Sequence, residues 1–305
     1  PQSAIRNPQS AIRNPQFFPT NPPTHLLFMI NQHIPKKLAS ANLLPTLYES
    51  QHSHWWSVGM RAITHALLSR ADAGGRMTLP SAPILEIGCG GGAFLDELVP
   101  RYPTHTILGT DLNPVALAHA KQAEGTLAQG RKHPVFQSDL HHLPLPADYC
   151  GMIVALDAFD QKGVQLFAAL TEAQRILQPG GLLLMRVSAY DWLRGPHDIA
   201  FGTGRRYSAQ ELEAALTEAH LEAVYFTYAN TLLLLPAIVV RLAQQMGYSS
   251  VQPQLNTSSA LNLLFKTILR AEAKWLRHHS LPAGLSLYAL ARKPQSDPAL
   301  KPTLK

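Results

Sequence analysis

Between residues 83 and 293, runs that are apolar at almost every position alternate with amphipathic stretches. Continuous apolar runs are typical of strands covered on both faces, as in a parallel sheet with helices above and below. Strands are predicted over residues 83–88, 104–111, 134–139, 151–157, 181–189, 222–228 and 285–293. Helices are predicted over residues 93–101, 114–124, 164–177 and 207–220, the last with Ser208 and Glu211 spaced as a capping box. The alternation predicts a doubly wound α/β fold.

The segments around this alternation suggest how the chain is divided. A helical segment is expected ahead of the sheet, at residues 29–80, with its helix over 48–70. Residues 230–280, between the last two strands, are helical, apolar and too long for a simple connection, so we expect an inserted helical cap. The main domain is therefore predicted at residues 81–293, followed by a tail at 294–305.

The first residues repeat a seven-residue unit, "PQSAIRN", twice and begin a third copy. This polar, proline-bearing unit cannot bury a core, so residues 1–28 are expected to be a disordered or extraneous repeat tail. The alternative is a tail that binds a partner.

The charge distribution argues against a nucleic-acid partner. The chain has a formal net charge of +6, but residues 1–48 carry +4 and residues 292–305 carry +3, which leaves about −1 for the rest. A nearly neutral middle offers no basic face for nucleic acid.

Cysteine and histidine usage suggests no disulfide framework and no metal site. Cys89 and Cys150 are the two cysteines, and a reducing, cytoplasmic compartment is the expected one. The histidine pairs at 141–142 and 278–279 lack metal-ligand spacing and are interpreted as surface residues. No apolar run reaches 18 residues, so no transmembrane span is predicted, and contact with a membrane surface stays open.

A run of small residues, 88–92, stands where the first strand should give way to a helix. Glycine weakens both kinds of element, and close approach of a ligand to the backbone at a helix N-terminus is the usual reason for such a run. Gly88, Gly90 and Gly92 are the glycines of this G-x-G-x-G pattern. Glu86, just before them, suits a ligand with an ammonium group better than a pyrophosphate, which it would repel. A tight turn without a ligand is the alternative.

Two aspartates end the next two strands. Asp111 can accept both hydroxyls of a ribose, and Asp139 with the backbone beside it can bond an adenine amino group while Leu140 packs on the ring. Each alone could be an ordinary turn aspartate. Together with Glu86 they place three acids at successive strand ends, on one edge of a parallel sheet.

Four segments together resemble class I S-adenosylmethionine-dependent methyltransferases: "LEIGCGGG", "GTDLNP", "SDLHHLPLPADYCGMIVALDAFDQ" and "RILQPGGLLLMRV". The resemblance covers about residues 84–293 and implies a Rossmann-like sheet of seven strands, mostly parallel with an antiparallel last strand. It implies S-adenosylmethionine as cofactor. The cofactor-binding residues that it implies are Glu86, Gly88, Gly90, Gly92, Asp111, Leu112, Asp139, Leu140 and Asp157. Gln161 stands where relatives often have histidine.

Two further segments, 54–61 and 189–212, resemble a largely uncharacterised bacterial subgroup of these enzymes. The second segment implies a substrate-binding loop with Trp192, Asp198, Arg205, Arg206 and Tyr207, and it offers His197 as the candidate catalytic base. Thr203 stands where that loop commonly has histidine. A loop histidine in solvent and a solvated arginine pair are the alternative interpretations.

The resemblance therefore implies a methyltransferase (EC 2.1.1.-) that acts on an unidentified small-molecule acceptor. The helical cap could enclose an apolar or lipid-like acceptor, or it could simply pack on the rest of the chain. One alternative function is a non-catalytic scaffold that binds S-adenosylmethionine. The other is an NAD-dependent oxidoreductase, against which the glycine spacing and Glu86 argue.

Overall fold

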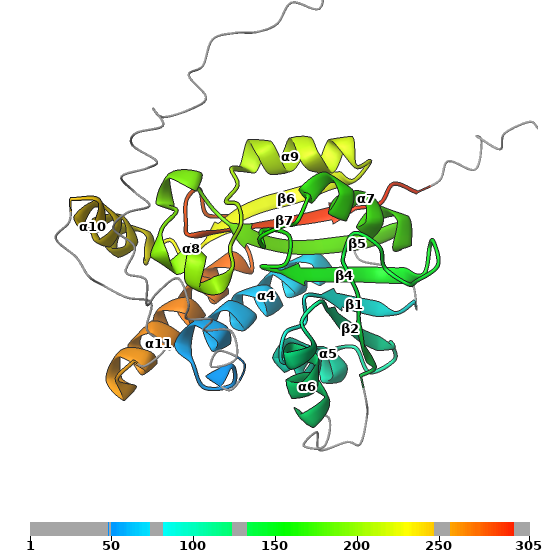
Figure 1. Ribbon diagram of the computed structural model, residues 1–305, viewed down its shortest axis with the longest axis horizontal. Helices are drawn as coiled ribbons and strands as arrows, with labels where there is room; N and C mark the ends of the chain where they lie inside the picture. Colours follow the sequence, from blue (N-terminus) through cyan, green and yellow to red (C-terminus); the bar gives the residue numbers. More distant parts are fainter. Residues whose placement is uncertain (1–47, 49, 74–81, 124–132, 247–256, 296–305) are drawn as a thin grey trace, which may run out of the picture.

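The computed structural model describes residues 48, 50–73, 82–123, 133–246 and 257–295 (Figure 1). The expected repeat tail at residues 1–28 lies outside the described residues. So do most of the N-terminal segment before Tyr48 and the greater part of the tail at 294–305.

A seven-stranded sheet forms the centre of the molecule, in the order β3-β2-β1-β4-β5-β7-β6. The strands are β1 (Ile84–Ile87), β2 (Ile107–Asp111), β3 (Val135–Gln137), β4 (Cys150–Leu156), β5 (Leu177–Ser188), β6 (Glu222–Ala229) and β7 (Ser286–Arg292). β7 runs antiparallel to its neighbours β5 and β6, and the other pairs are parallel. The predicted fold class is confirmed. The strand order reverses between β1 and β4, where the carboxyl ends of strands in such sheets leave a crevice.

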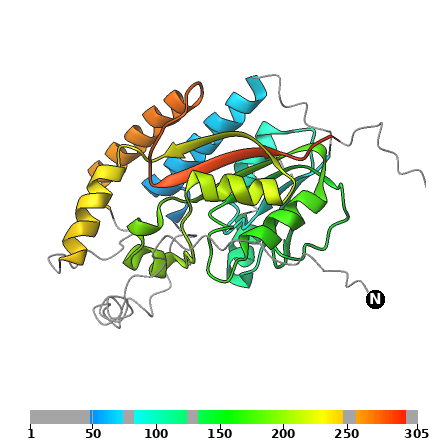
Figure 2. The same cartoon turned by 90° about the horizontal axis from the view of Figure 1, so that it is seen from above.

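Helices cover both faces of the sheet (Figures 1 and 2). They are α4 (Trp55–Ala73), α5 (Ala93–Arg101), α6 (Pro114–Ala123), α7 (Leu166–Ile176), the 3-10 turn η1 (Asp191–Leu193), α8 (Pro196–Phe201), α9 (Ala209–Glu218), α10 (Leu234–Gln245) and α11 (Ser259–Leu276). The capping box of α9 is confirmed, because Glu211 N donates to Ser208 Oγ and Ser208 N donates to Glu211 Oε2 at 2.8 Å. The sequence did not predict η1 or α8.

Two hydrophobic cores lie on the two faces of the sheet. One contains Leu170 of α7 and Leu212 of α9, and the other contains Leu67 of α4, Leu95 of α5 and Leu269 of α11. The sequence pattern predicted this arrangement, because strands that are apolar at every position need cover on both faces.

The two helices of the predicted cap have different surroundings. α11 packs along α4 and buries Leu269, Ala273 and Leu276, whereas α10 has no buried residue among those described. Ala237 and Arg241 of α10 line a cavity, and Leu235 and Val239 of the same helix are exposed. No helix in the described part of the chain is long and apolar enough to cross a membrane. Of the two roles expected for the cap, α11 therefore has the packing role, whereas α10 forms part of a cavity wall.

Candidate functional site

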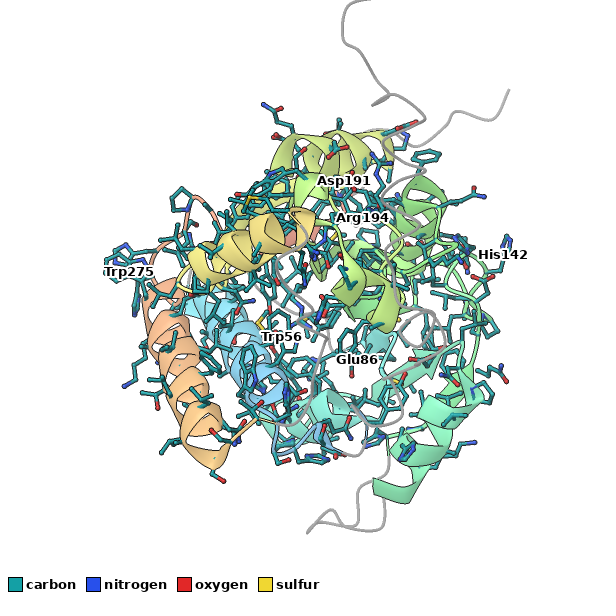
Figure 3. The ribbon with its side chains drawn as sticks, turned by 60° about the vertical axis from the view of Figure 1, so that its left-hand side comes forward. Trp56, Glu86, His142, Asp191, Arg194 and Trp275 are labelled. Atoms are coloured by element: carbon teal, nitrogen blue, oxygen red, sulfur yellow. The ribbon has the colours of Figure 1, made fainter. Side chains whose placement is uncertain are left out.

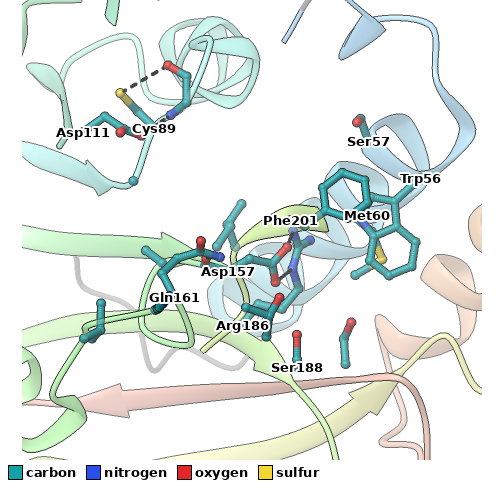
Figure 4. Close-up of a pocket in the computed structure, with 18 of the residues that line it drawn as sticks. Trp56, Ser57, Met60, Cys89, Asp111, Asp157, Gln161, Arg186, Ser188 and Phe201 are labelled. Carbon is teal, nitrogen blue, oxygen red and sulfur yellow. Dashed lines mark hydrogen bonds and ion pairs between the residues drawn. The ribbon is translucent and has the colours of Figure 1, made fainter. Parts of the chain in front are cut away.

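A cavity of about 1050 Å³ opens at the edge of the sheet where the parallel strands end. Its wall includes the ends of β1, β2, β4 and β5, the start of β7, and residues of α4, α8 and α10. In Figure 4, Cys89 and Asp111 lie on one side, Trp56 and Met60 lie on the other, and Arg186 lies between them. Figure 3 shows Trp56 and Glu86 toward the middle of the molecule. Two groups of residues, one at each side, therefore share one space.

The glycine loop supplies bare backbone to the first side. Gly88, Gly90 and Gly92 have φ of 72°, 53° and 84°, which is the left-handed region that favours glycine. A Cβ on Gly88 would lie 2.7 Å from the Cβ of Ala158, so a larger residue has no room there. Gly88 and Gly90 line the cavity, while Gly92 stands at the start of α5 and does not. The loop fits a ligand that approaches the backbone closely.

Glu86 is a buried acid on the cavity wall. It is 3% exposed, and within the described part of the chain its Oε2 atom has no hydrogen-bond partner. Burial, together with the nearby Asp111 carboxylate, raises the pKa of Glu86 well above its ordinary value. A cationic ligand group in the cavity would supply the partner that this carboxyl lacks. The residue therefore fits the ammonium group of S-adenosylmethionine.

Asp111, at the end of β2, is oriented by backbone amides. Gly90 N donates to its Oδ2 atom at 2.9 Å and Asn113 N donates to its Oδ1 atom at 2.8 Å. Burial raises its pKa, and these amides act in the opposite direction. The neighbouring Leu112 is 64% exposed and lines the cavity. Asp111 thus joins the glycine loop to the end of β2 and leaves lone pairs for a ligand.

Asp139 lies after β3 and is held by a histidine. His141 N donates to Asp139 Oδ1 at 2.9 Å, and the His141 Nδ1 atom lies 2.6 Å from the same oxygen. Gln165 N donates to His141 Nε2 at 3.0 Å, so Nδ1 carries the proton and donates it to Asp139. The amide and the ring both lower the pKa of Asp139. Asp139, Leu140 and His141 all line the cavity, and no signal in the sequence separated His141 from a surface histidine.

Asp157, after β4, forms an ion pair with a buried arginine. Arg186 Nε donates to Asp157 Oδ1 at 2.7 Å, and Arg186 Nη2 bonds the other oxygen. Asp157 has φ of 56°, a strained conformation for a residue other than glycine. Arg186 lines the cavity, but it is not among the site residues predicted from the sequence. Its position as a charged residue inside the apolar run of β5 is a signal of a functional role. The pair fixes the floor between the two sides of the cavity.

Asp160 is a second buried acid close to this pair. Ser188 N donates to its Oδ2 atom at 2.8 Å, and no described residue bonds its Oδ1 atom. Burial, and then the nearby Asp157 carboxylate, raises the pKa of Asp160 to about 6. Asp160 does not line the cavity, so its role is in the wall behind it.

The loop after β5 brings His197 and Arg206 to the second side of the cavity. Arg206 Nε donates to Asp198 Oδ1 at 2.7 Å, and Gly195 N donates to Asp198 Oδ2 at 2.6 Å. The His197 ring packs on Phe201 with 4.4 Å between centroids. His197 is exposed toward the cavity, yet desolvation by the surrounding protein lowers its pKa to about 4. The nearby Asp198 carboxylate acts in the opposite direction, and the Arg206 and Arg241 guanidinium groups lower the pKa further. His197 is therefore neutral at pH 7.

The other expected residues of this loop do not line the cavity. Asp198 and Tyr207 are buried, Trp192 is 57% exposed, and Arg205 donates to Glu211 Oε1 at 2.7 Å on the surface. Of the predicted substrate-binding residues, the structure brings only Arg206 to the cavity wall.

Gln161 and Thr203, the two departures from the relatives' pattern, both line the cavity and face each other across a β-bridge. Gln161 Nε2 also donates to the carbonyl oxygen of Asp157 at 2.9 Å. Among the described residues, no group of three histidine, cysteine, aspartate or glutamate side chains could hold a metal ion.

Comparisons with known proteins point to one family. A family model described as "Methyltransferase domain" matches residues 84–181. The chain is 26% identical over 210 residues to a malonyl-[acyl-carrier protein] O-methyltransferase of Geobacter sulfurreducens, covering 63% of this chain and 76% of that protein. It is 29% identical over 101 residues to the enzyme of the same name from Legionella pneumophila, of which the match spans 34%.

Solved structures share the fold. A putative sarcosine dimethylglycine methyltransferase from Galdieria sulphuraria has a TM-score of 0.52 at 16% identity, covering 76% of this chain and 86% of that one. A putative methyltransferase of Haloferax volcanii, in complex with the Trm112 methyltransferase activator, has a TM-score of 0.52 at 18% identity, covering 82% and 93%.

Proposed function

We propose that this chain is a class I S-adenosylmethionine-dependent methyltransferase with S-adenosylmethionine as its cofactor, and that it methylates a small-molecule acceptor bound in the cavity. One observation carries the proposal: the cavity of about 1050 Å³ adjoins both the strand-end acids and a separate wall from α4, α8 and α10. Pockets for one small ligand have volumes of roughly 300–1000 Å³. The space therefore suits a donor and an acceptor together.

The first side of the cavity is the proposed donor site. Glu86 would hold the ammonium group, Asp111 the ribose hydroxyls, and Asp139 with Leu140 the adenine. The positive-φ glycines allow the backbone to approach the ligand, and His141 keeps the Asp139 carboxylate in place. S-adenosylmethionine bound here would supply the methyl group of its sulfonium, and the rest of the donor would leave as a neutral thioether.

The second side is the proposed acceptor site. Methyl transfer from a sulfonium is an in-line displacement, so the protein contributes mainly by holding the acceptor atom in line. Asp157 and Arg186, between the two sides, would position that atom. His197, neutral at pH 7, can accept a proton from an acceptor hydroxyl or amine, but its low pKa makes it a weak base. Both malonyl-[acyl-carrier protein] methyltransferases that the chain resembles are named O-methyltransferases. Methylation of an oxygen atom is therefore the first reaction to test.

Ligand binding and turnover distinguish this proposal from the two alternatives. S-adenosylhomocysteine should raise the melting temperature, whereas NAD at the same concentration should not, because NAD has no ammonium group for Glu86 and carries a pyrophosphate that this carboxylate would repel. Incubation of cell extract with the protein and isotopically labelled donor should yield a labelled product by mass spectrometry. Binding without release of S-adenosylhomocysteine would support the scaffold instead, and a larger shift with NAD would support the oxidoreductase.

A pair of variants separates the donor site from the acceptor site. Asp111→Ala should weaken S-adenosylhomocysteine binding at least tenfold in calorimetry, because charge-assisted hydrogen bonds contribute about 1.5–3 kcal/mol each. His197→Ala should leave that affinity nearly unchanged, and it should lower turnover about 10²- to 10⁴-fold if the ring is a general base. The reverse pattern would contradict both assignments.

A further inference from the structure

We propose that Arg241 and Arg206 form a carboxylate-binding subsite in the acceptor side of the cavity, so that the acceptor is an apolar molecule with one carboxylate. The inference rests on the proposed function, since it names the acceptor class for the same cavity. Arg241 comes from α10, and Arg206 comes from the loop after β5. Both arginines line the cavity.

Arg241 is held in place by neutral groups. Its Nε atom donates to the carbonyl oxygen of Leu193 at 2.9 Å, and its Nη1 atom donates to Gln244 Oε1 at 2.7 Å. No carboxylate of the described residues lies within ion-pair distance of this guanidinium. A half-buried arginine held in this way has a defined position and no direct ion-pair partner among the described residues.

Gly195 makes room for this guanidinium. A Cβ on Gly195 would lie 1.5 Å from Arg241 Nη1, so the arginine occupies the space where a side chain would stand. The backbone of Gly195 has φ of 179°, an extended conformation that any residue adopts. The glycine therefore permits this position of the Arg241 guanidinium, and a larger residue at 195 would displace it.

Arg241 and the two charged groups that act on it, Arg206 and Asp198, together leave a surplus of one positive charge. Asp198 bonds Arg206 directly and also attracts Arg241, while the Asp157 carboxylate is taken up by Arg186. His197 adds no charge at pH 7, because desolvation in the cavity wall and both arginines lower its pKa to about 4. One carboxylate, which carries a single negative charge, would balance this surplus, whereas a phosphate dianion would exceed it.

The cavity wall on this side combines polar residues such as Gln244 and His197 with an apolar part. The residues of the apolar part are Trp56, Met60, Leu193, Phe201, Ala237 and Val240. Trp56, Met60 and Phe201 lie on the same side of the cavity in Figure 4. An acceptor with a carboxylate would therefore place a hydrocarbon body against this apolar part of the wall, since burial of apolar area favours such binding.

Binding of simple probes to the protein saturated with S-adenosylhomocysteine tests the subsite. In calorimetry, octanoate should bind at least tenfold more tightly than octanamide, and octyl phosphate and octylamine should bind more weakly than octanoate. Equal affinity for octanoate and octanamide would overturn the proposal. Tighter binding of octyl phosphate would overturn the choice of carboxylate. Failure of S-adenosylhomocysteine to bind at all would instead contradict the proposed function.

Three variants assign the effect to Arg241. Arg241→Gln should lower octanoate affinity at least tenfold and leave that for S-adenosylhomocysteine unchanged. Gly195→Ala should also weaken octanoate binding, because it displaces the guanidinium while keeping its charge. Arg194→Gln is the control: this arginine is exposed, pairs with Asp191 and does not line the cavity. Unchanged octanoate binding in Arg241→Gln, or an equal loss in Arg194→Gln, would contradict the subsite.

Discussion

Two buried carboxyl groups, Glu86 on the cavity wall and Asp160 behind it, destabilise the folded state when they ionise. Among the described residues, neither Glu86 Oε2 nor Asp160 Oδ1 has a hydrogen-bond partner. Glu86 faces the cavity, whereas Asp160 does not line it. In both cases burial is the largest cause of a raised pKa. When the folded state raises the pKa of an acid, the stability of the protein falls as pH rises above the ordinary pKa of that acid.

The first prediction is that Glu86→Gln affects stability and binding in opposite directions. At pH 8 the ligand-free variant should melt at a higher temperature than the parent protein, because it no longer buries a group that tends to ionise. Its affinity for S-adenosylhomocysteine should fall at least tenfold, because the ammonium group loses a carboxylate. Thermal melts at pH 5 and pH 8 with calorimetric titration measure both effects.

Glu213→Gln, on the exposed surface of α9, is the matched control and should change neither quantity. If Glu86→Gln bound S-adenosylhomocysteine as tightly as the parent protein, Glu86 would not be a cofactor ligand.

The second prediction concerns Asp160 and pH. Its pKa of about 6 lies above the ordinary 3.8, so its contribution to stability is present below pH 4 and is lost as pH rises through 6. Asp160→Asn keeps an oxygen acceptor for Ser188 N but cannot ionise. The free energy of unfolding of the variant, relative to the parent, should therefore rise by roughly 3 kcal/mol between pH 4 and pH 7. Urea unfolding across this range measures it, and a constant difference would contradict the assignment.

At the scale of helices, α4 and α11 meet at a single glycine. A Cβ on Gly59 would lie 2.2 Å from Leu269 Cδ1, and Leu269 is fully buried. The contact joins segments about 200 residues apart, and it supports the wall of the cavity because Trp56 and Met60 of α4 line that wall. A contact between residues so far apart in the chain cannot be predicted from the local sequence pattern.

The third prediction is that the effect of Gly59→Ala changes sign with residue 269. In the parent protein, the added methyl group should lower the free energy of unfolding by about 1–3 kcal/mol through overpacking. In a Leu269→Gly background all the side-chain atoms that the new methyl group would meet are absent. There the same change should be neutral or stabilising by up to about 1 kcal/mol, since alanine favours helix more than glycine. A double-mutant cycle by urea unfolding measures the coupling, and additive effects would contradict it.

Elements set by local chemistry were predictable from the sequence, and elements set by distant contacts were not. The capping box of α9 depends on residues three positions apart, and it was found. The position of β7 between β5 and β6 depends on pairing across the chain, and the helical cap proved to be two helices with different surroundings. The short helix α8 begins at Pro196, directly after Gly195, in a loop whose sequence shows no helical periodicity.

The same distinction applies to the site in the whole molecule. Glu86, Asp111 and Asp139 could be brought together from the sequence, because the carboxyl ends of parallel strands meet at one edge. Arg241 and Gln51 also line the cavity, but they come from α10 and from the segment before α4, and nothing local marks them. Tertiary packing alone brings these residues to the cavity.

The segment before α4 is tied to the glycine loop by a short network of bonds. Gln51 Nε2 donates to the carbonyl oxygen of Gly91 at 3.0 Å. Arg61 Nη1 donates to the carbonyl oxygen of Gln51 at 2.8 Å, and Arg61 Nε donates to Glu97 Oε1 of α5 at 2.7 Å. A ligand that orders the glycine loop should therefore also order the N-terminal segment.

The last prediction follows from this network. S-adenosylhomocysteine should slow amide hydrogen exchange in residues 50–61 as well as in the glycine loop, because both must open together to release the ligand. The amides of α9, on the other side of the sheet, should not change. In Gln51→Ala, S-adenosylhomocysteine should still slow amide exchange in the glycine loop but no longer at residues 50–61. The affinity of this variant for S-adenosylhomocysteine should fall roughly two- to tenfold, because one hydrogen bond is lost. Mass spectrometry of peptides from both proteins measures this, and equal slowing of residues 50–61 in the two would show that the network does not couple them.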